Sequence, residues 1–266
     1  MNGCLAQLVE QWTVNPCVAG SKPAAAAKDL VNTKSFFLFT RDKLVSYRIK
    51  NAAAAKGLSL MTIKEQKMFL RKKAKAELQK YSEDLELIKE CTKSCAKFFL
   101  ESEIYKKSEH IFAYMAMIDE IDLTPVFEAA LKDGKKLYFP RMIPDSNDME
   151  FYQIDNLDET LSKDNKYGIL EPSLDKIKIE KNEIKDKSVF LVPGLAFNLF
   201  GHRLGRGKGY YDKYLSQINN KSAVFCGVCI TNVITRAIPV EENDFAMNYL
   251  LTESGFIPVG EIYHVW

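Results

Sequence analysis

From residue 61 onward, apolar side chains recur along the chain first at helical and then at strand-like spacing. Between residues 69 and 78 they fall three or four positions apart, which is typical of an amphipathic helix. Thr62 and Glu65 stand ahead of this run with the spacing of a capping box, so we expect the helix to begin just after Thr62. A second helical pattern extends from Leu85 to Leu100. The folded region is therefore predicted to start with two consecutive helices.

Short apolar runs downstream indicate buried strands, and helical segments separate them. The strand candidates are HIFAYMAM (110–117), KKLYFP (135–140), SVFLVP (188–193) and AVFCGVCI (223–230). The helix candidates between them are PVFEAALKDG (125–134), with Gly134 as its C-cap, and YYDKYL (210–215). This order predicts an α/β fold, a single domain with a mostly parallel open sheet flanked by helices. We expect the ligand at the carboxyl ends of the strands.

Residues 142–187 interrupt this regular order. They are polar and rich in charge, and they contain short strand-like pieces such as MEFYQI (149–154). We expect them to form loops over the ligand site.

The first sixty residues differ in composition from the rest. They contain two short alanine tracts, at 24–27 and 52–55, and their SFFLFT run is too short to span a bilayer. They lack a basic segment followed by a continuous apolar one, so a secretory peptide is not indicated. An organelle transit peptide is left open because the segment is poor in acidic residues, although it is also poor in arginine. We interpret residues 1–60 as an unstructured extension, native or artefactual, and residues 61–266 as the folded domain.

The charge balance bears on the kind of partner. Eight of the 37 Lys and Arg residues and three of the 35 Asp and Glu residues lie in residues 1–60, which leaves 29 cationic and 32 acidic residues in the rest. A nucleic-acid-binding module that uses the basic N-terminal arm is therefore the less favoured alternative. We expect small-molecule partners, no nucleic acid, no membrane association, and a monomer in the cytoplasm.

The cysteines of the folded region do not indicate a metal site. Cys226 and Cys229 lie three positions apart in a strand-like run, so their side chains point to opposite faces. Cys91 and Cys95 share a helix face, but no histidine stands near them in sequence. We predict that these four are buried or half-buried thiols in a reducing compartment.

Candidate chemistry concentrates between residues 189 and 215. Four of the 13 glycines fall within nine residues there and alternate with three cations: Gly201, Arg203, Gly205, Arg206, Gly207, Lys208 and Gly209. Glycine permits positive φ and close approach of backbone N–H groups, while the cations donate charge-assisted hydrogen bonds to anions. The spacing matches neither a P-loop nor a dinucleotide fingerprint. Strand, loop and helix start together predict a phosphate cradle, with a flexible surface loop as the plain alternative.

Longer motifs carry a resemblance to a known family. They are, in chain order, KMFLRKKAKAEL (67–78), AYMAMIDEIDL (113–123), YFPR (138–141), YGILEP (167–172), PGLAF (193–197), RLGRGKGYYDKYL (203–215) and IPVEENDF (238–245). Over about residues 61–254 the chain resembles the 5-formyltetrahydrofolate cyclo-ligases, also called methenyltetrahydrofolate synthetases. The resemblance implies ATP- and Mg²⁺-dependent cyclisation of 5-formyltetrahydrofolate to 5,10-methenyltetrahydrofolate. In this reaction the formyl oxygen is phosphorylated, and ADP and phosphate are released.

The same resemblance implies roles for individual residues. For ATP it implies Lys67, Arg71, Arg203, Leu204, Gly205, Arg206, Gly207, Lys208, Gly209, Tyr210 and Tyr211. For the folate it implies Met115, Glu120, Tyr167, Arg206, Gly207, Lys208, Gly209 and Tyr210. Arg206 and Lys208 are the expected catalytic residues, and Asp212 and Asp244 are the expected Mg²⁺ ligands. Arg141, at the end of a predicted strand, could serve a carboxylate or a phosphate.

Considered without the resemblance, several of these residues have plainer interpretations. Lys67 and Arg71 fit a solvated basic helix, and Asp212 fits a helix cap. Tyr210 and Tyr211 could anchor their helix as well as pack against a pterin. A sugar-phosphate isomerase or CoA-transferase-like α/β enzyme, which uses a phosphate cradle without ATP and takes Asp212 as its catalytic carboxylate, is the alternative function.

Two positions depart from the family pattern. Asn198 stands where an aspartate usually follows PGxAF, and Met247 and Asn248 replace a usual apolar-Asp pair. Asparagine can keep the hydrogen bonds of an aspartate but loses its charge. We expect weaker activity if either aspartate serves the metal or the geometry of the loop.

Overall fold

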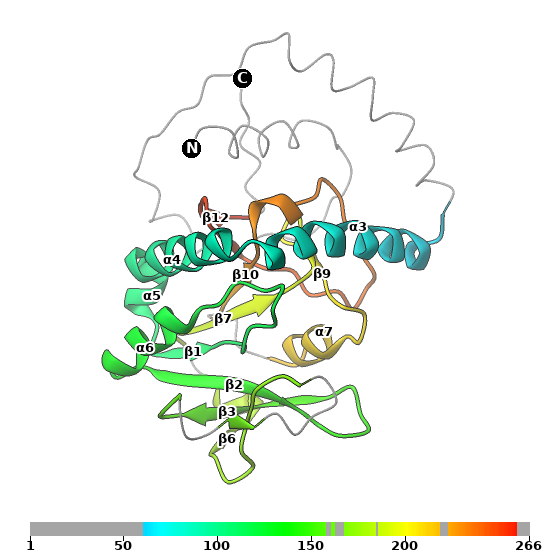
Figure 1. The fold of residues 1–266 in the computed structure, drawn as a ribbon. Coiled ribbons are helices and arrows are strands. Elements are labelled where there is room, and N and C mark those ends of the chain that lie inside the picture. The colour runs from blue at the N-terminus through cyan, green and yellow to red at the C-terminus, as the bar shows by residue number, and fades with distance from the viewer. Residues whose placement is uncertain (1–60, 158–160, 163–167, 185, 219–222, 260–266) are drawn as a thin grey trace, which may run out of the picture.

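The structure is a computed structural model that describes residues 61–157, 161–162, 168–184, 186–218 and 223–259 (Figure 1). At its centre an eight-stranded sheet has the order β12-β11-β10-β7-β1-β2-β3-β6. Its strands are β1 (His110–Phe112), β2 (Lys136–Met142), β3 (Met149–Ile154), β6 (Lys178–Ile179), β7 (Ser188–Pro193), β10 (Val224–Val228), β11 (Tyr249–Thr252) and β12 (Gly255–Pro258). The five strands from β11 to β2 are parallel, and antiparallel pairing is confined to the two edges. The predicted α/β fold with a mostly parallel sheet is confirmed.

The remaining elements surround this sheet. The helices are α3 (Ile63–Glu83), α4 (Leu85–Glu101), α5 (Glu103–Lys107), α6 (Thr124–Lys132) and α7 (Tyr210–Leu215), with 3₁₀ turns η2 (Lys181–Glu183) and η3 (Thr231–Val233). Two short antiparallel ladders lie outside the main sheet: β4 (Leu161–Ser162) with β5 (Glu171–Pro172), and β8 (Ala196–Phe197) with β9 (Arg203–Leu204). In Figure 1, α3 and α4 follow one another across the part of the sheet around β10 and β7.

Local capping explains where the first two helices begin and break. The Thr62 and Glu65 side chains each accept a hydrogen bond from the other residue's backbone N–H, which is the predicted capping box. Asp84 ends α3 and begins α4, and its Oδ1 accepts from the backbone N–H groups of Glu86 and Leu87. One residue therefore separates the two predicted helices.

Aromatic rings from neighbouring strands form the middle of the core. The register pairs Phe112 of β1 with Tyr138 of β2 and Phe190 of β7. Phe112 stacks on both rings, with centroid separations of 4.7 Å and 4.2 Å respectively. Because these strands are parallel and in register, the segments that follow β1, β2 and β7 emerge at the same edge of the sheet.

Two segments differ from the sequence prediction. The strand predicted over residues 110–117 ends at Phe112, because the chain then turns and buries Tyr114, whose hydroxyl donates to the carbonyl of Ile121 at 2.8 Å. The region 142–187, predicted as loops, adds β3 and β6 to the sheet. Within this region, Met142, Met149 and residues 169–171 line the ligand pocket described below.

Predictions about thiols and membranes can be compared with the described residues. Cys91, Cys95, Cys226 and Cys229 are buried thiols, as predicted, and burial raises the pKa of Cys226. In the described part of the chain, no helix has the length and apolar character that crossing a bilayer requires. The predictions for residues 1–60 fall outside the described residues.

Candidate active site

A pocket of about 330 Å³ lies at the carboxyl ends of β1, β2 and β7. The glycine-rich loop forms one wall, α3 contributes Lys67 and Arg71, and the segment after β1 contributes Met115 and Glu120. Of the predicted site residues, those lining the pocket are Lys67, Arg71, Met115, Glu120, Arg203, Leu204, Gly205, Arg206, Gly207, Lys208, Gly209, Tyr210, Tyr211, Asp212 and Asp244. Tyr167 lies outside the described residues.

The glycine-rich loop starts as a small hairpin and ends at a helix. After β7, β8 and β9 pair, and residues 205–209 then lead into α7. Gly207 and Gly209 have φ of +105° and +75°, in the left-handed region where a side chain would be strained. The positive φ values explain why glycine occupies these two positions in the wall of the pocket.

Both asparagines that depart from the family pattern hold backbone groups. Oδ1 of Asn198 accepts from the backbone N–H groups of Phe200 and His202 at 3.0 Å and 2.9 Å, which closes the turn between β8 and β9. Oδ1 of Asn248 accepts from Phe225 N–H at 2.8 Å. Neither asparagine lines the pocket. An amide oxygen can accept these hydrogen bonds as a carboxylate would, so at both positions the asparagine holds the local backbone conformation.

Lys67 is held deep in the wall by two carboxylates. Its Nζ lies 2.6 Å from Oδ2 of Asp244 and 2.7 Å from Oε2 of Glu241, and only 7% of the residue is exposed. Burial opposes the charge of Lys67, but the hydrogen bonds to Asp244 and Glu241 outweigh it and raise its pKa. Lys67 is therefore a fixed cation at the edge of the pocket, and not part of a solvated basic face.

Arg71, one helical turn further along α3, attaches this helix to the glycine loop. Its Nε donates to the carbonyl of Gly205 at 3.0 Å. A Cβ built on Gly207 would meet the Arg71 guanidinium at 3.4 Å, so the second half of the loop also packs against this side chain. The two cations predicted to share a helix face thus both contribute to one pocket.

Arg203 and Asp212 form a buried ion pair beneath the loop. Nη2 of Arg203 lies 2.8 Å from Oδ2 of Asp212, and the side chains are 5% and 22% exposed. The Arg203 guanidinium also lies over the Tyr211 ring, 5.4 Å from its centroid. Tyr210 donates from its hydroxyl to the carbonyl of Ser146 at 3.3 Å. Both tyrosines therefore anchor the start of α7 while they line the pocket.

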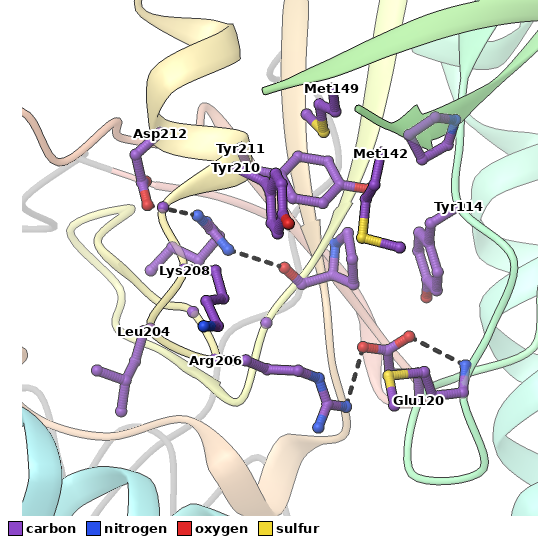
Figure 2. A pocket seen from close by; sticks show the side chains of 18 of the residues that line it. Tyr114, Glu120, Met142, Met149, Leu204, Arg206, Lys208, Tyr210, Tyr211 and Asp212 are labelled. Atoms are coloured by element: carbon purple, nitrogen blue, oxygen red, sulfur yellow. Dashed lines mark hydrogen bonds and ion pairs between the residues drawn. The ribbon is translucent and has the colours of Figure 1, made fainter. Parts of the chain in front are cut away.

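Arg206 reaches across the pocket to two acids on the segment after β1. Its Nη2 lies 2.6 Å from Oδ1 of Asp119 and 3.0 Å from Oε1 of Glu120. Figure 2 shows the contact with Glu120. Oε2 of Glu120 accepts from Met117 N–H at 3.1 Å. Burial raises the pKa of Glu120 above its ordinary value, although Arg206 and the Met117 N–H act in the opposite direction.

Lys208 differs from the other cations of the pocket. It is exposed, and no carboxylate of the described residues lies within ion-pair distance of it. Lys67, Arg203 and Arg206 already have acidic partners, and Arg71 holds the loop. Lys208 is therefore the cation best able to meet an incoming anion without first giving up a partner.

The opposite wall of the pocket is apolar. It is formed by Pro140, Met142, Met149, Ile169 and Leu170. Figure 2 shows Met142, Met149 and Tyr114 on one side, Lys208 and Asp212 on the other, and the two tyrosines between them. The pocket thus offers a charged half and an apolar half, which suits a ligand pair of contrasting chemistry.

Asp212 and Asp244, the expected Mg²⁺ ligands, both line the pocket, and one carboxylate oxygen of each is paired with a cation. They lie close together, since Oδ1 of Asp212 accepts from the N–H of Phe245 at 3.5 Å. Among the described residues no group of three or more His, Cys, Asp or Glu side chains could hold a metal ion. This donor set fits Mg²⁺ that arrives with phosphates, because Mg²⁺ commonly takes one or two carboxylates and completes its shell with phosphate and water.

Three outcomes add to or correct the residue predictions. Arg141 does not line the pocket, and instead its Nη1 donates to the carbonyl of Pro172 at 2.5 Å. Glu241 and Asp119 were not predicted, yet they hold the pocket cations Lys67 and Arg206. Glu241 lies three residues before Asp244 in one motif and Asp119 is next to Glu120, so sequence proximity was the available signal.

These features define an α/β protein with a ligand pocket at the carboxyl edge of its sheet, half cationic and half apolar. Residues 63–253 match the 5-formyltetrahydrofolate cyclo-ligase family. The chain belongs to this family, an enzyme family, and the resemblance drawn from its motifs is confirmed.

Individual relatives agree with this assignment. A probable 5-formyltetrahydrofolate cyclo-ligase of Schizosaccharomyces pombe is 34% identical over 170 residues, which cover 60% of this chain and 82% of the relative. The 5-formyltetrahydrofolate cyclo-ligase of Mus musculus is 27% identical over 200 residues, covering 74% and 98%. The NMR structure of Aquifex aeolicus 5,10-methenyltetrahydrofolate synthetase superposes with a TM-score of 0.59 at 27% identity, covering 75% of this chain and 99% of that one.

Proposed function

We propose that the protein converts 5-formyltetrahydrofolate to 5,10-methenyltetrahydrofolate in a reaction that consumes ATP, requires Mg²⁺ and releases ADP and phosphate. One observation carries the proposal: Arg206, on the glycine-rich loop, contacts Glu120 on the opposite side of a single pocket. A phosphate bound at the loop and a folate bound at Glu120 would therefore share one cavity, as transfer of a phosphoryl group between them requires.

The two halves of the pocket suit the two reactants. The triphosphate would lie along the cationic half, near Lys67, Arg71 and Lys208. The pterin would lie in the apolar half, where the Glu120 carboxylate can accept hydrogen bonds from its N–H groups. Met115 lies on the same segment as Glu120 and lines the same part of the site.

The chemistry assigns a task to the two proposed catalytic cations. A formamide oxygen is a poor leaving group, so it first attacks the γ-phosphorus of ATP, and the bond from that phosphorus to the β-phosphate oxygen breaks to release ADP. The neighbouring folate nitrogen then forms a bond to the formyl carbon and loses its proton to solvent or to the departing phosphate, and the carbon–oxygen bond breaks to release phosphate. Arg206 and Lys208 would stabilise the negative charge on the transferring group during the first step.

Asp212 and Asp244 would hold the metal that accompanies the nucleotide. Bound Mg²⁺ would neutralise charge on the β- and γ-phosphates. The role of the chain is to keep two carboxylates beside the cationic wall, each already oriented by Arg203 or Lys67. This arrangement supports binding of a magnesium–nucleotide complex better than binding of the free ion.

One assay tests the proposal. The absorbance of the methenyl product is followed after 5-formyltetrahydrofolate is added, with and without Mg-ATP. Product formation only with Mg-ATP, together with stoichiometric ADP, supports the proposal. Formation without ATP, or turnover of a sugar phosphate or acyl-CoA instead, would favour the ATP-independent alternative.

We further propose that the enzyme acts as a monomer in the cytoplasm on small-molecule substrates. Light scattering of the full chain tests the first statement, with a mass of twice 30.3 kDa as the contradicting result. Imaging of the full chain carrying a C-terminal fluorescent protein tests the second, and organelle fluorescence would assign a targeting role to residues 1–60.

A further inference from the structure

The apolar wall of the pocket includes a segment that lies outside the main sheet. Ile169, Leu170 and Glu171 line the pocket, and Glu171 begins β5, which pairs with β4. Met142, at the end of β2, lines the same wall. Because β4 and β5 form a separate ladder, the position of this wall depends on how β5 is attached to β2.

Two reciprocal hydrogen bonds make that attachment. Oε1 of Glu171 accepts from the backbone N–H of Met142 at 3.0 Å, and Nη1 of Arg141 donates to the carbonyl of Pro172 at 2.5 Å. Adjacent residues of β2 thus bind adjacent residues of β5, and each bond involves one charged side chain. Glu171 is 4% exposed, which makes loss of its hydrogen bond costly.

We propose that Arg141 and Glu171 are positioning residues that clasp β5 onto the end of β2 and thereby fix the apolar wall for the folate. The inference rests on the proposed function, which supplies the identity of the ligand. The five cations of the pocket lie on α3 and the glycine-rich loop, away from this wall. A loosened clasp therefore affects the aromatic substrate and leaves the nucleotide half intact.

Arg141 offers the cleaner test because it does not line the pocket. Arg141→Met keeps the apolar stem and removes the donor to Pro172. We expect the KM for 5-formyltetrahydrofolate to rise about tenfold, which corresponds to about 1.4 kcal/mol, with the KM for ATP and kcat little changed. Arg141→Lys, which can restore a charged donor, should recover most of the affinity.

A matched control separates this effect from a general loss of stability. Lys178→Met removes a cation on β6 that pairs with Glu150 and Glu180 and does not line the pocket. It should leave both KM values unchanged. Glu171→Gln, which keeps an oxygen for Met142 N–H, should be milder than Glu171→Leu, which keeps none.

Direct binding distinguishes failure of this inference from failure of the proposed function. Equilibrium binding of 5-formyltetrahydrofolate without ATP, and separately of Mg-ATP without folate, is measured for wild type, Arg141→Met and Lys178→Met. Weaker folate binding by Arg141→Met alone, with faster amide exchange in residues 168–171, supports the clasp. Equal binding by all three variants overturns the clasp only, and equal loss of affinity for folate and ATP in Arg141→Met overturns it in favour of a general structural role. No binding by wild type overturns the proposed function and the clasp with it.

Discussion

Arg206 donates a hydrogen bond from Nη2 to Oε1 of Glu120 at 3.0 Å, and this bond joins two segments that lie 86 residues apart in the chain. It neutralises a buried carboxylate and a cation that the proposed reaction needs for two different ligands. A bound folate would replace Arg206 as the partner of Glu120, and a bound phosphate would replace Glu120 as the partner of Arg206. Arg206 and Glu120 are thus already paired with each other before the substrates enter.

Replacement of Arg206 should affect chemistry more than stability. Arg206→Ala removes a donor to the transferring phosphoryl group, so kcat should fall by about a hundredfold or more. Lys213→Ala, on α7, removes a cation whose exposed ion pair with Asp148 lies outside the pocket, and it should retain full activity. Steady-state rates of methenyl product formation compare the two. Equal rates for Arg206→Ala and wild type would remove the loop from the mechanism.

Lys208 should act mainly in nucleotide binding and in stabilising transferred charge, because among the described residues it has no acidic partner to lose. Lys208→Ala should raise the KM for ATP about tenfold or more and lower kcat. Lys208→Arg should retain part of the wild-type affinity for ATP and part of the wild-type kcat. The melting temperature should not change, since the side chain is exposed and unpaired among the described residues. A drop in melting temperature with unaltered kinetics would contradict this role.

The sequence was sufficient to predict much of this site because its residues sit in continuous motifs. The glycine-rich loop, Lys67 with Arg71 on one helix face, and Asp244 are local patterns, and each does line the pocket. The alternation of strand and helix signals likewise predicted the mostly parallel sheet. The family resemblance assigned Lys67, Arg71 and Asp244 to the site, since spacing alone lets Lys67 and Arg71 fit a solvated basic helix.

What the sequence could not supply were contacts between distant segments. Nothing local indicates that Glu241 binds Lys67, 174 residues earlier, or that Arg141 binds Pro172 in place of a ligand. The sequence predicts MEFYQI (149–154) as a strand-like piece within a loop region, but whether such a short piece joins the main sheet depends on its pairing with β2. All three features depend on contacts between separate segments of the chain.

Stability should respond to pH through Glu120, whose pKa burial raises above 4.5. A carboxyl with a raised pKa binds its proton more tightly in the folded state, so its contribution to stability is present below about pH 4.5 and declines as pH rises through the folded-state pKa. Glu120→Gln removes this titration. The melting temperature of the variant relative to wild type should therefore increase from pH 4.5 upward, and parallel pH profiles would contradict the expectation.

Lys67 should matter for stability as well as for the nucleotide. Lys67→Met leaves Asp244 and Glu241 facing each other without the cation, and we expect a loss of about 1–2 kcal/mol of unfolding free energy because both acids are partly solvated. Lys75→Met, on the exposed face of α3, provides the control and should be neutral. Urea unfolding measures both variants. Equal midpoints for the two would mean that the ion pairs of Lys67 with Asp244 and Glu241 add nothing to stability.

The two carboxylates proposed as Mg²⁺ ligands should contribute differently to stability, because they have different cationic partners. Asp212→Asn withdraws the counter-charge from Arg203, whose side chain is only 5% exposed, so unfolding free energy should fall by about 1–3 kcal/mol. Asp244→Asn should cost less, because Lys67 keeps Glu241 as a partner. Both variants should need more Mg²⁺ for half-maximal rate, since each loses a charged ligand for the magnesium–nucleotide complex.

A magnesium titration at saturating ATP and folate, with EDTA-treated protein as the zero point, measures that requirement. Lys213→Ala again serves as the control, because it changes charge on the same helix as Asp212 without touching the pocket. If both Asp variants followed the wild-type magnesium curve, the carboxylates would act only as partners of Arg203 and Lys67. The nucleotide alone would then hold the metal. The two substitutions would still differ in their effect on unfolding free energy, because Asp212 and Asp244 pair with different cations in the pocket wall.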